Sequence, residues 1–116
     1  MGETMEIEAI DPRYPVGKFK RPEKVTPHQR VAAIAALAEL PGRLNEAVNG
    51  LDPEQLETPY REGGWTVQQL VHHIADSHMN AFLRVRMALT EDWPTITPYA
   101  EKAWATLHDS AAPVTW

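Results

Sequence analysis

Three of the five histidines in the sequence lie within seven residues, at His72, His73 and His78. A neutral imidazole is the commonest metal ligand among side chains, and it also titrates near neutral pH. The spacing differs from the His-Glu-x-x-His pair of zinc metalloproteases, which excludes that class. The sequence contains no cysteine, so thiolate metal sites, disulfides and a cysteine nucleophile are excluded as well. A metal bound here would be held by nitrogen and oxygen atoms.

The histidine cluster falls in a run from Val67 to Thr90 without glycine or proline, which predicts one helix of about six turns. At about 100° per residue, His78 lies within the apolar face, so we expect a buried imidazole with one hydrogen-bonded partner. His72 lies nearly opposite that face, where we expect it to be solvated. His73 lies on the border of the apolar face. In helical bundles such a border faces the groove where inward-pointing side chains bind metals.

Polar side chains continue this border beyond His73. Asp76 and Asn80 could hydrogen-bond to a metal ligand, which makes them weak candidates for outer partners of a metal site. Ser77 lies one turn after His73, but a helix interior supplies neither a strained nucleophile turn nor oxyanion donors, so a serine nucleophile is rejected. From the residues alone, His73 remains either a structural boundary histidine or a single metal ligand.

Two long helices must position these side chains. Thr26 and Gln29 are typical of a helix start, because the threonine caps the helix and the glutamine completes a capping box. Apolar residues then recur at helical spacing for about six turns, with a kink expected at Pro41. Thr66 with Gln69 predicts the same kind of start for the second long helix.

Shorter elements complete the chain. We expect a helical turn over residues 52–56 and a short helix from Thr97-Pro98 to about Leu107, while residues 109–116 show no pattern. Residues 1–26 lack helical periodicity and are interpreted as an irregular N-terminal arm. Strand alternation is absent throughout the sequence, so the predicted fold class is all-α.

The composition fits a single small domain of 116 residues. Sixteen acidic residues against eleven basic ones give a net charge of −5, which argues against nucleic acid as a partner. No apolar run approaches the ~18 residues of a membrane span, and the first residues lack signal-peptide character. We therefore expect a cytoplasmic protein with neither a nucleic-acid nor a membrane partner.

Several strings of the sequence closely resemble the YfiT-type branch of the DinB-like superfamily. The resemblance rests on residues 60–67 (YREGGWTV) and 71–80 (VHHIADSHMN), and it extends to residues 14–17, 98–99 and 101–104. It implies an up-down four-helix bundle and a metal-dependent hydrolase that acts on a small-molecule substrate. Some relatives are metal-dependent S-transferases that use a low-molecular-weight thiol such as bacillithiol, and this alternative stays open.

The resemblance also implies a zinc or nickel ion held by three histidines. One of these ligands follows the family's tryptophan by eight residues, which maps onto His73 when the tryptophan is Trp65. The other two form an H-x-x-x-H pair in a fourth helix near the family's C-terminus, and neither His28 nor His108 matches them. No catalytic residue is assigned from the sequence.

The resemblance predicts that residues 1–116 form an apparently truncated single domain, with the arm, two long helices and a short loop helix of the bundle. We expect the parent protein to be the enzyme and this chain to be inactive alone. The apolar faces of the two long helices would then lack covering partners, and a homodimer could bury them. A non-catalytic helical module that self-associates is the third hypothesis.

Overall fold

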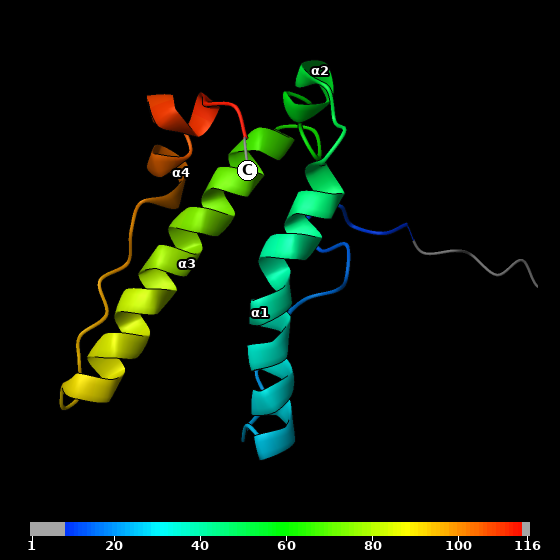
Figure 1. Cartoon of the computed structure of the whole chain (residues 1–116). Helices are drawn as coiled ribbons and strands as arrows, with labels where there is room; N and C mark the ends of the chain where they lie inside the picture. Colours follow the sequence, from blue (N-terminus) through cyan, green and yellow to red (C-terminus); the bar gives the residue numbers. More distant parts are fainter. Residues whose placement is uncertain (1–8, 115–116) are drawn as a thin grey trace, which may run out of the picture. The chain divides into compact units, whose positions relative to one another are not determined.

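The computed structural model describes residues 9–114, and their regular structure is helical (Figure 1). The only strand-type pairing in this range is an isolated bridge between Pro59 and Thr66, which confirms the predicted all-α class. Residues 1–8 of the expected arm and 115–116 of the expected tail lie outside the described range. The elements are α1 (Pro27–Val48), α2 (Pro53–Leu56), α3 (Val67–Thr90), α4 (Glu101–Trp104) and the 3-10 helix η1 (His108–Ala111).

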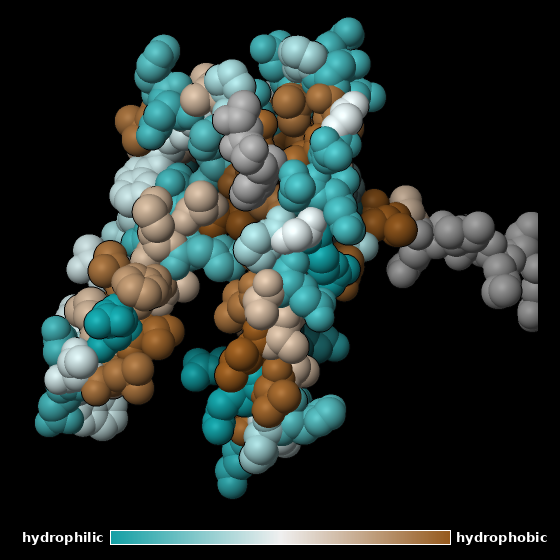
Figure 2. All heavy atoms as spheres, viewed as in Figure 1, coloured by the Kyte–Doolittle hydropathy of each residue, from teal (hydrophilic) through white to brown (hydrophobic). Residues whose placement is uncertain are grey.

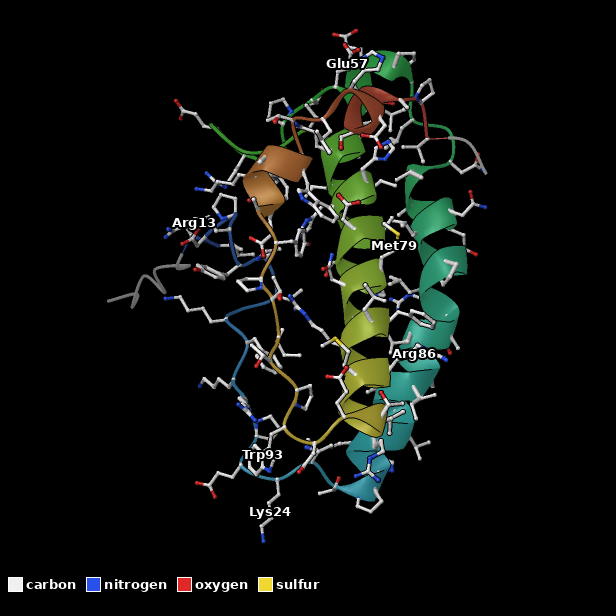
Figure 3. All side chains as sticks on the ribbon, turned by 90° about the vertical axis from the view of Figure 1, so that its left-hand side faces the viewer. Arg13, Lys24, Glu57, Met79, Arg86 and Trp93 are labelled. Carbon is white, nitrogen blue, oxygen red and sulfur yellow. The ribbon has the colours of Figure 1, made fainter. Side chains whose placement is uncertain are left out.

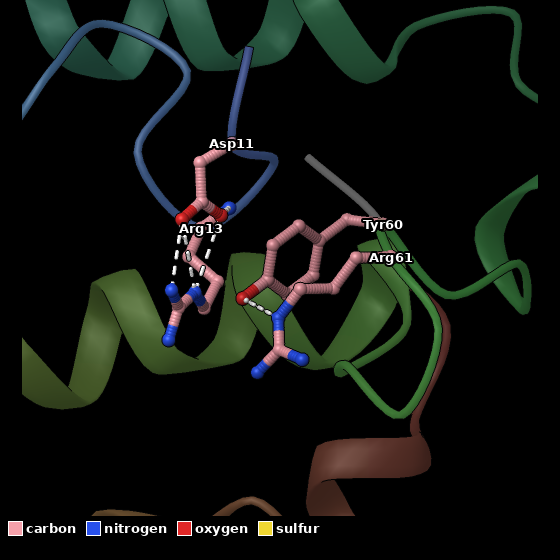
Figure 4. Close-up of polar contacts among 4 residues, drawn as sticks. All are labelled: Asp11, Arg13, Tyr60 and Arg61. Carbon is pink, nitrogen blue, oxygen red and sulfur yellow. Dashed lines mark hydrogen bonds and ion pairs between the residues drawn. The ribbon is translucent and has the colours of Figure 1, made fainter. Parts of the chain in front are cut away.

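No helix within the described range combines the length and the apolar character that crossing a bilayer requires. The chain forms two compact units that divide after Glu39. In the first unit, residues 9–26 contain turns but no helix or strand. One turn is closed by the Tyr14 amide, which donates to the Asp11 carbonyl at 2.9 Å. The Arg13 guanidinium donates to the Asp11 carboxylate at 2.8 Å, as Figure 4 shows.

Helix α1 begins with the capping box that the sequence predicts. The Gln29 amide donates to Thr26 Oγ1 at 3.1 Å, and the Thr26 amide donates to Gln29 Oε1 at 2.9 Å. These two bonds satisfy amides that a helix start leaves without an intrahelical partner. The helix continues through Pro41 to Val48, although an interior proline removes one backbone hydrogen bond and crowds the preceding turn. The kink expected at Pro41 stays a prediction. The prediction of one long helix across this proline is confirmed.

Helix α3 carries the histidine cluster, and its start is fixed in the same way. The Gln69 amide donates to Thr66 Oγ1 at 3.1 Å, and the Thr66 amide donates to Gln69 Oε1 at 3.0 Å. The predicted span from Val67 to Thr90 is confirmed. Asp52 and Gln55 form a third capping box at the start of α2, where the sequence predicts a helical turn.

The segment after α3 differs from the prediction. The sequence predicts one helix from Pro98 to about Leu107, but α4 covers only Glu101–Trp104, and η1 forms where no structure is expected. Ser110 explains the second turn, because its hydroxyl donates to the Trp104 carbonyl at 2.9 Å and its amide donates to the Leu107 carbonyl at 3.0 Å. A local side-chain bond to the backbone therefore ends one turn and starts the next.

The best-buried residues of the second unit lie at α3 and the segment that follows it. Within residues 9–114, the buried residues are Val71, Ala105 and Ser110. Val71 belongs to α3, Ala105 follows α4, and Ser110 belongs to η1. Both α4 and η1 lie beside the N-terminal part of α3 (Figure 1). This small core holds the part of α3 in which the candidate site lies.

The remaining apolar face of α3 is exposed. Val85 and Leu89, two apolar residues in the C-terminal half of this helix, are 58% and 80% exposed. Figure 2 shows apolar residues at the surface of both long helices, and Met79 projects from the side of α3 in Figure 3. The expectation that apolar faces would lie uncovered is met. A helical stripe indicates which side can be buried, not what covers it.

Candidate functional site

His73 lies two turns into α3 and is half-buried. Its imidazole packs against the indole of Trp65, with ring centroids 4.8 Å apart and an angle of 61° between the ring planes. Aromatic quadrupoles favour this edge-to-face arrangement. Within residues 9–114, neither ring nitrogen of His73 makes a hydrogen bond, whereas both neighbouring histidines do. The side chain can therefore offer a ring nitrogen to a metal.

Trp65 is placed by a tight turn that leads into α3. The Tyr60 amide donates to the Trp65 carbonyl at 3.0 Å, and the Gly64 amide donates to the Arg61 carbonyl at 3.0 Å. Gly63 has a φ of 69°, in the left-handed region that glycine adopts at little cost. The turn therefore brings the chain back on itself and sets Trp65 directly before the first residue of the capping box.

Gly64 is required by space rather than by its backbone angles. A Cβ at this position would lie 2.6 Å from Arg61 Cγ and 2.8 Å from Tyr60 Cε1. The two side chains are held together because Arg61 Nε donates to Tyr60 Oη at 2.8 Å (Figure 4). The guanidinium of Arg61 also lies 5.4 Å from the Tyr60 ring centroid, within the range of a cation–π contact. A side chain at Gly64 would displace this pair.

The prediction that His72 is solvated is wrong. His72 is half-buried, and its Nε2–H donates to the Ala112 carbonyl at 3.0 Å. Gln68, one turn earlier, donates through Nε2 to the carbonyls of Ala111 and Ala112, the second at 2.6 Å. The cause is η1, which brings two carbonyls to a helix side that the angles leave in solvent. The role of Gln68 was not predicted from the sequence, although its i, i+4 spacing to His72 places both side chains on one face.

The prediction of a buried His78 is also wrong, although the expected partner is present. His78 is exposed, and its Nδ1–H donates to the Ile74 carbonyl one turn earlier at 2.7 Å. It lines a shallow apolar hollow along α3 with Met79 and Phe82, both exposed. The cause is that the apolar face of α3 is uncovered along this part of the helix.

The polar border beyond His73 is bonded mainly to backbone. Asn80 Nδ2 donates to the Asp76 carbonyl at 2.8 Å, and Arg84 donates to the Thr97 carbonyl at 3.3 Å. Asp76 is half-buried. In the described part of the chain, no hydrogen bond joins Asp76 or Asn80 to His73, so their role as outer partners of a metal site stays a prediction.

The described residues offer one candidate metal ligand, His73, rather than a complete site. Among residues 9–114, no three side chains of the histidine, cysteine, aspartate or glutamate type are grouped to hold a metal. A catalytic zinc takes three protein ligands and keeps one position open. His73 fits the donor chemistry of one such ligand, while His28 in α1 and His108 in η1 do not join it in a group of this kind. The assignment of His73 as a ligand stays a prediction.

Comparison with known proteins places the chain in a family. Residues 36–114 match the DinB superfamily. A protein of Bacillus subtilis (strain 168) named "Putative metal-dependent hydrolase YfiT" is 48% identical over 104 residues. A protein of Geobacillus kaustophilus (strain HTA426) with the same functional description is 53% identical over 105 residues. Each alignment covers 90% of this chain, but 58% and 59% of the relative.

A solved structure of YfiT from Bacillus subtilis, described as having an unusual four-helix bundle topology, is similar with a TM-score of 0.83. The similarity covers 87% of this chain and 58% of that chain at 48% identity, which confirms the predicted bundle class. The chain thus spans about three-fifths of the length of these relatives. With a family match over residues 36–114 and this structural likeness, the chain belongs to the DinB superfamily.

Proposed function

We propose that this chain contributes to a metal-dependent hydrolase in which His73 is one metal ligand. The observation that supports the proposal is the imidazole of His73, which packs on Trp65 and makes no hydrogen bond within residues 9–114. Two relatives at 48% and 53% identity carry the description of a metal-dependent hydrolase. The substrate class that we propose is a small molecule.

The cofactor that we propose is a divalent metal, zinc or nickel. Imidazole nitrogen suits both ions. When bound, such an ion supplies Lewis acidity that activates water and polarises a scissile bond. Because residues 9–114 group no other ligands with His73, the proposal requires two further ligands from outside this set.

The part that this chain's own residues play is to hold His73 in place. The turn over residues 60–65 sets Trp65 against the ring, and the capping box of Thr66 and Gln69 fixes the start of α3. The amide of Gln68 joins the same turns of α3 to the chain after η1. A ligand histidine gains from such support, because metal sites depend on groups that orient the ring.

We also propose that the protein forms a homodimer. The support is the exposed apolar face of α3, where Met79, Phe82 and Leu83 are each more than half exposed. Contiguous apolar surface of this kind marks interaction sites in soluble proteins. A second copy would remove this face from water.

The hydrolase proposal is tested with the complete protein and chromogenic ester and amide substrates. We expect a chelator to abolish hydrolysis, zinc or nickel to restore it, and His73→Ala to remove it. His78→Ala is the matched control on the same helix and should retain activity, since His78 is exposed and bonds to its own helix. Activity that appears only when a low-molecular-weight thiol is added as co-substrate would contradict hydrolysis and favour S-transfer.

A further inference from the structure

We propose that Trp65 is the positioning residue of His73, and that the edge-to-face contact of the two rings holds the imidazole ready for a metal. This inference rests on the proposed function, because positioning matters only if His73 is a ligand. The surroundings of the His73 ring can be measured without any catalytic assay.

The three histidines of α3 are oriented by different contacts. His72 and His78 each donate a hydrogen bond to a backbone carbonyl, at 3.0 Å and 2.7 Å. His73 makes no such bond within residues 9–114, and its ring contact is with Trp65 at 4.8 Å between centroids. Metal-binding histidines are usually oriented by a hydrogen bond from their second nitrogen. Here the indole restrains the ring and leaves both nitrogens open.

The indole is itself well anchored. The Trp65 carbonyl accepts a hydrogen bond from the Tyr60 amide at 3.0 Å, and the next residue, Thr66, is bridged to Pro59 and caps α3. Trp65 is half-buried. Hydrogen bonds therefore hold the backbone of Trp65 and of Thr66, so the turn and the start of α3 together fix the position of the indole beside His73.

A simpler role for Trp65 would be a hydrophobic staple, in which the residue before the cap packs on the fourth helical residue. In α3 the fourth residue is Leu70, whereas the ring contact of Trp65 reaches His73, three residues further on. A staple would stabilise the start of the helix but would not depend on the orientation of His73. The two roles therefore predict different effects on the metal affinity of the imidazole.

The experiment compares Trp65→Leu and Trp65→Phe in the complete protein, with Trp93→Leu as matched control because Trp93 is 93% exposed. The ring C–H signals of His73 in NMR spectra, assigned with His73→Ala, report the surroundings of the imidazole. Competition with a chelating dye measures affinity for Zn²⁺ alone.

We expect Trp65→Leu to shift the His73 ring signals, because the ring current of the indole is lost, and to weaken zinc binding about 10- to 100-fold. Trp65→Phe keeps a smaller ring at this position and should give a smaller shift and a smaller loss. Trp93→Leu should change neither quantity.

Unchanged His73 signals or unchanged zinc affinity in Trp65→Leu would overturn the proposal and leave Trp65 as a staple. If circular dichroism shows that Trp65→Leu loses its helices, Trp65→Phe decides by the same two criteria, because it keeps an aromatic side chain in the turn. A different result would contradict the proposed function itself. If His73 is not a metal ligand, His73→Ala keeps the zinc affinity of the parent protein, whatever happens to the His73 ring signals in the Trp65 variants.

Discussion

Replacing Gln68 with methionine tests whether a side-chain amide holds the chain after η1 against α3. Gln68 Nε2 donates to the carbonyls of Ala111 and Ala112, and methionine keeps the length of the side chain without its donors. A hydrogen bond of this kind contributes about 0.5–1.5 kcal/mol net. His72 still donates to the Ala112 carbonyl at 3.0 Å, so one of the two acceptors keeps a partner. We therefore expect local opening of η1 to become easier by about 1–2 kcal/mol.

Hydrogen exchange of two amides in this segment measures the effect. The Ser110 amide donates to Leu107 and the Ala112 amide to Asp109, so both exchange only when the turn opens. A loss of about 1–2 kcal/mol predicts about 5- to 30-fold faster exchange at both amides. Arg86→Met, on the exposed side of the same helix, is the matched control and should leave them unchanged. Exchange rates in Gln68→Met equal to those of the parent protein would refute the reasoning.

Two further predictions concern the turn before α3 and its exposed face. Gly64→Ala should lower the free energy of unfolding by about 1–2 kcal/mol in chemical denaturation, because its Cβ would lie 2.6 Å from Arg61 Cγ. Gly42→Ala is the control, because Gly42 has open space around it in the interior of α1. It should raise the free energy of unfolding by about 0.5–1 kcal/mol. An equal decrease in both variants would show that the packing argument is wrong. Phe82→Glu should shift sedimentation from dimer to monomer, since it puts a charge on the exposed apolar face. The new carboxylate would lie one turn before Arg86, where an i, i+4 ion pair stabilises the helix. Ala100→Glu, in an exposed loop, is the control, and an equal shift from dimer to monomer in this variant would count against the interface.

The long helices could be predicted because their signals are local. Thr26 with Gln29 and Thr66 with Gln69 each satisfy helix-start amides within four residues of chain, so the sequence alone contains both partners of each bond. The helix across Pro41 could be predicted because the apolar spacing keeps its phase beyond the proline, and α1 does span 22 residues.

The surroundings of the histidines could not be predicted, because they depend on contacts distant in sequence. His72 bonds to the carbonyl of Ala112, which is 40 residues away in the sequence. This carbonyl follows η1, a turn that is held by the hydrogen bond from the Ser110 hydroxyl to the Trp104 carbonyl. The helical angles agree with the half-buried state of His73, but they predicted an exposed His72, which is half-buried, and a buried His78, which is exposed. Angles describe one helix, whereas burial depends on which other segments pack against it.

Zinc binding by His73→Ala in the complete protein tests the central claim most directly. Titration calorimetry with Zn²⁺, and with Ni²⁺ in a parallel series, should show a stoichiometric site in the parent protein and in His78→Ala. The account predicts that His73→Ala loses this site, because three ligands define a catalytic zinc centre and one of them is removed. Stoichiometric metal binding of unchanged affinity in His73→Ala would contradict it.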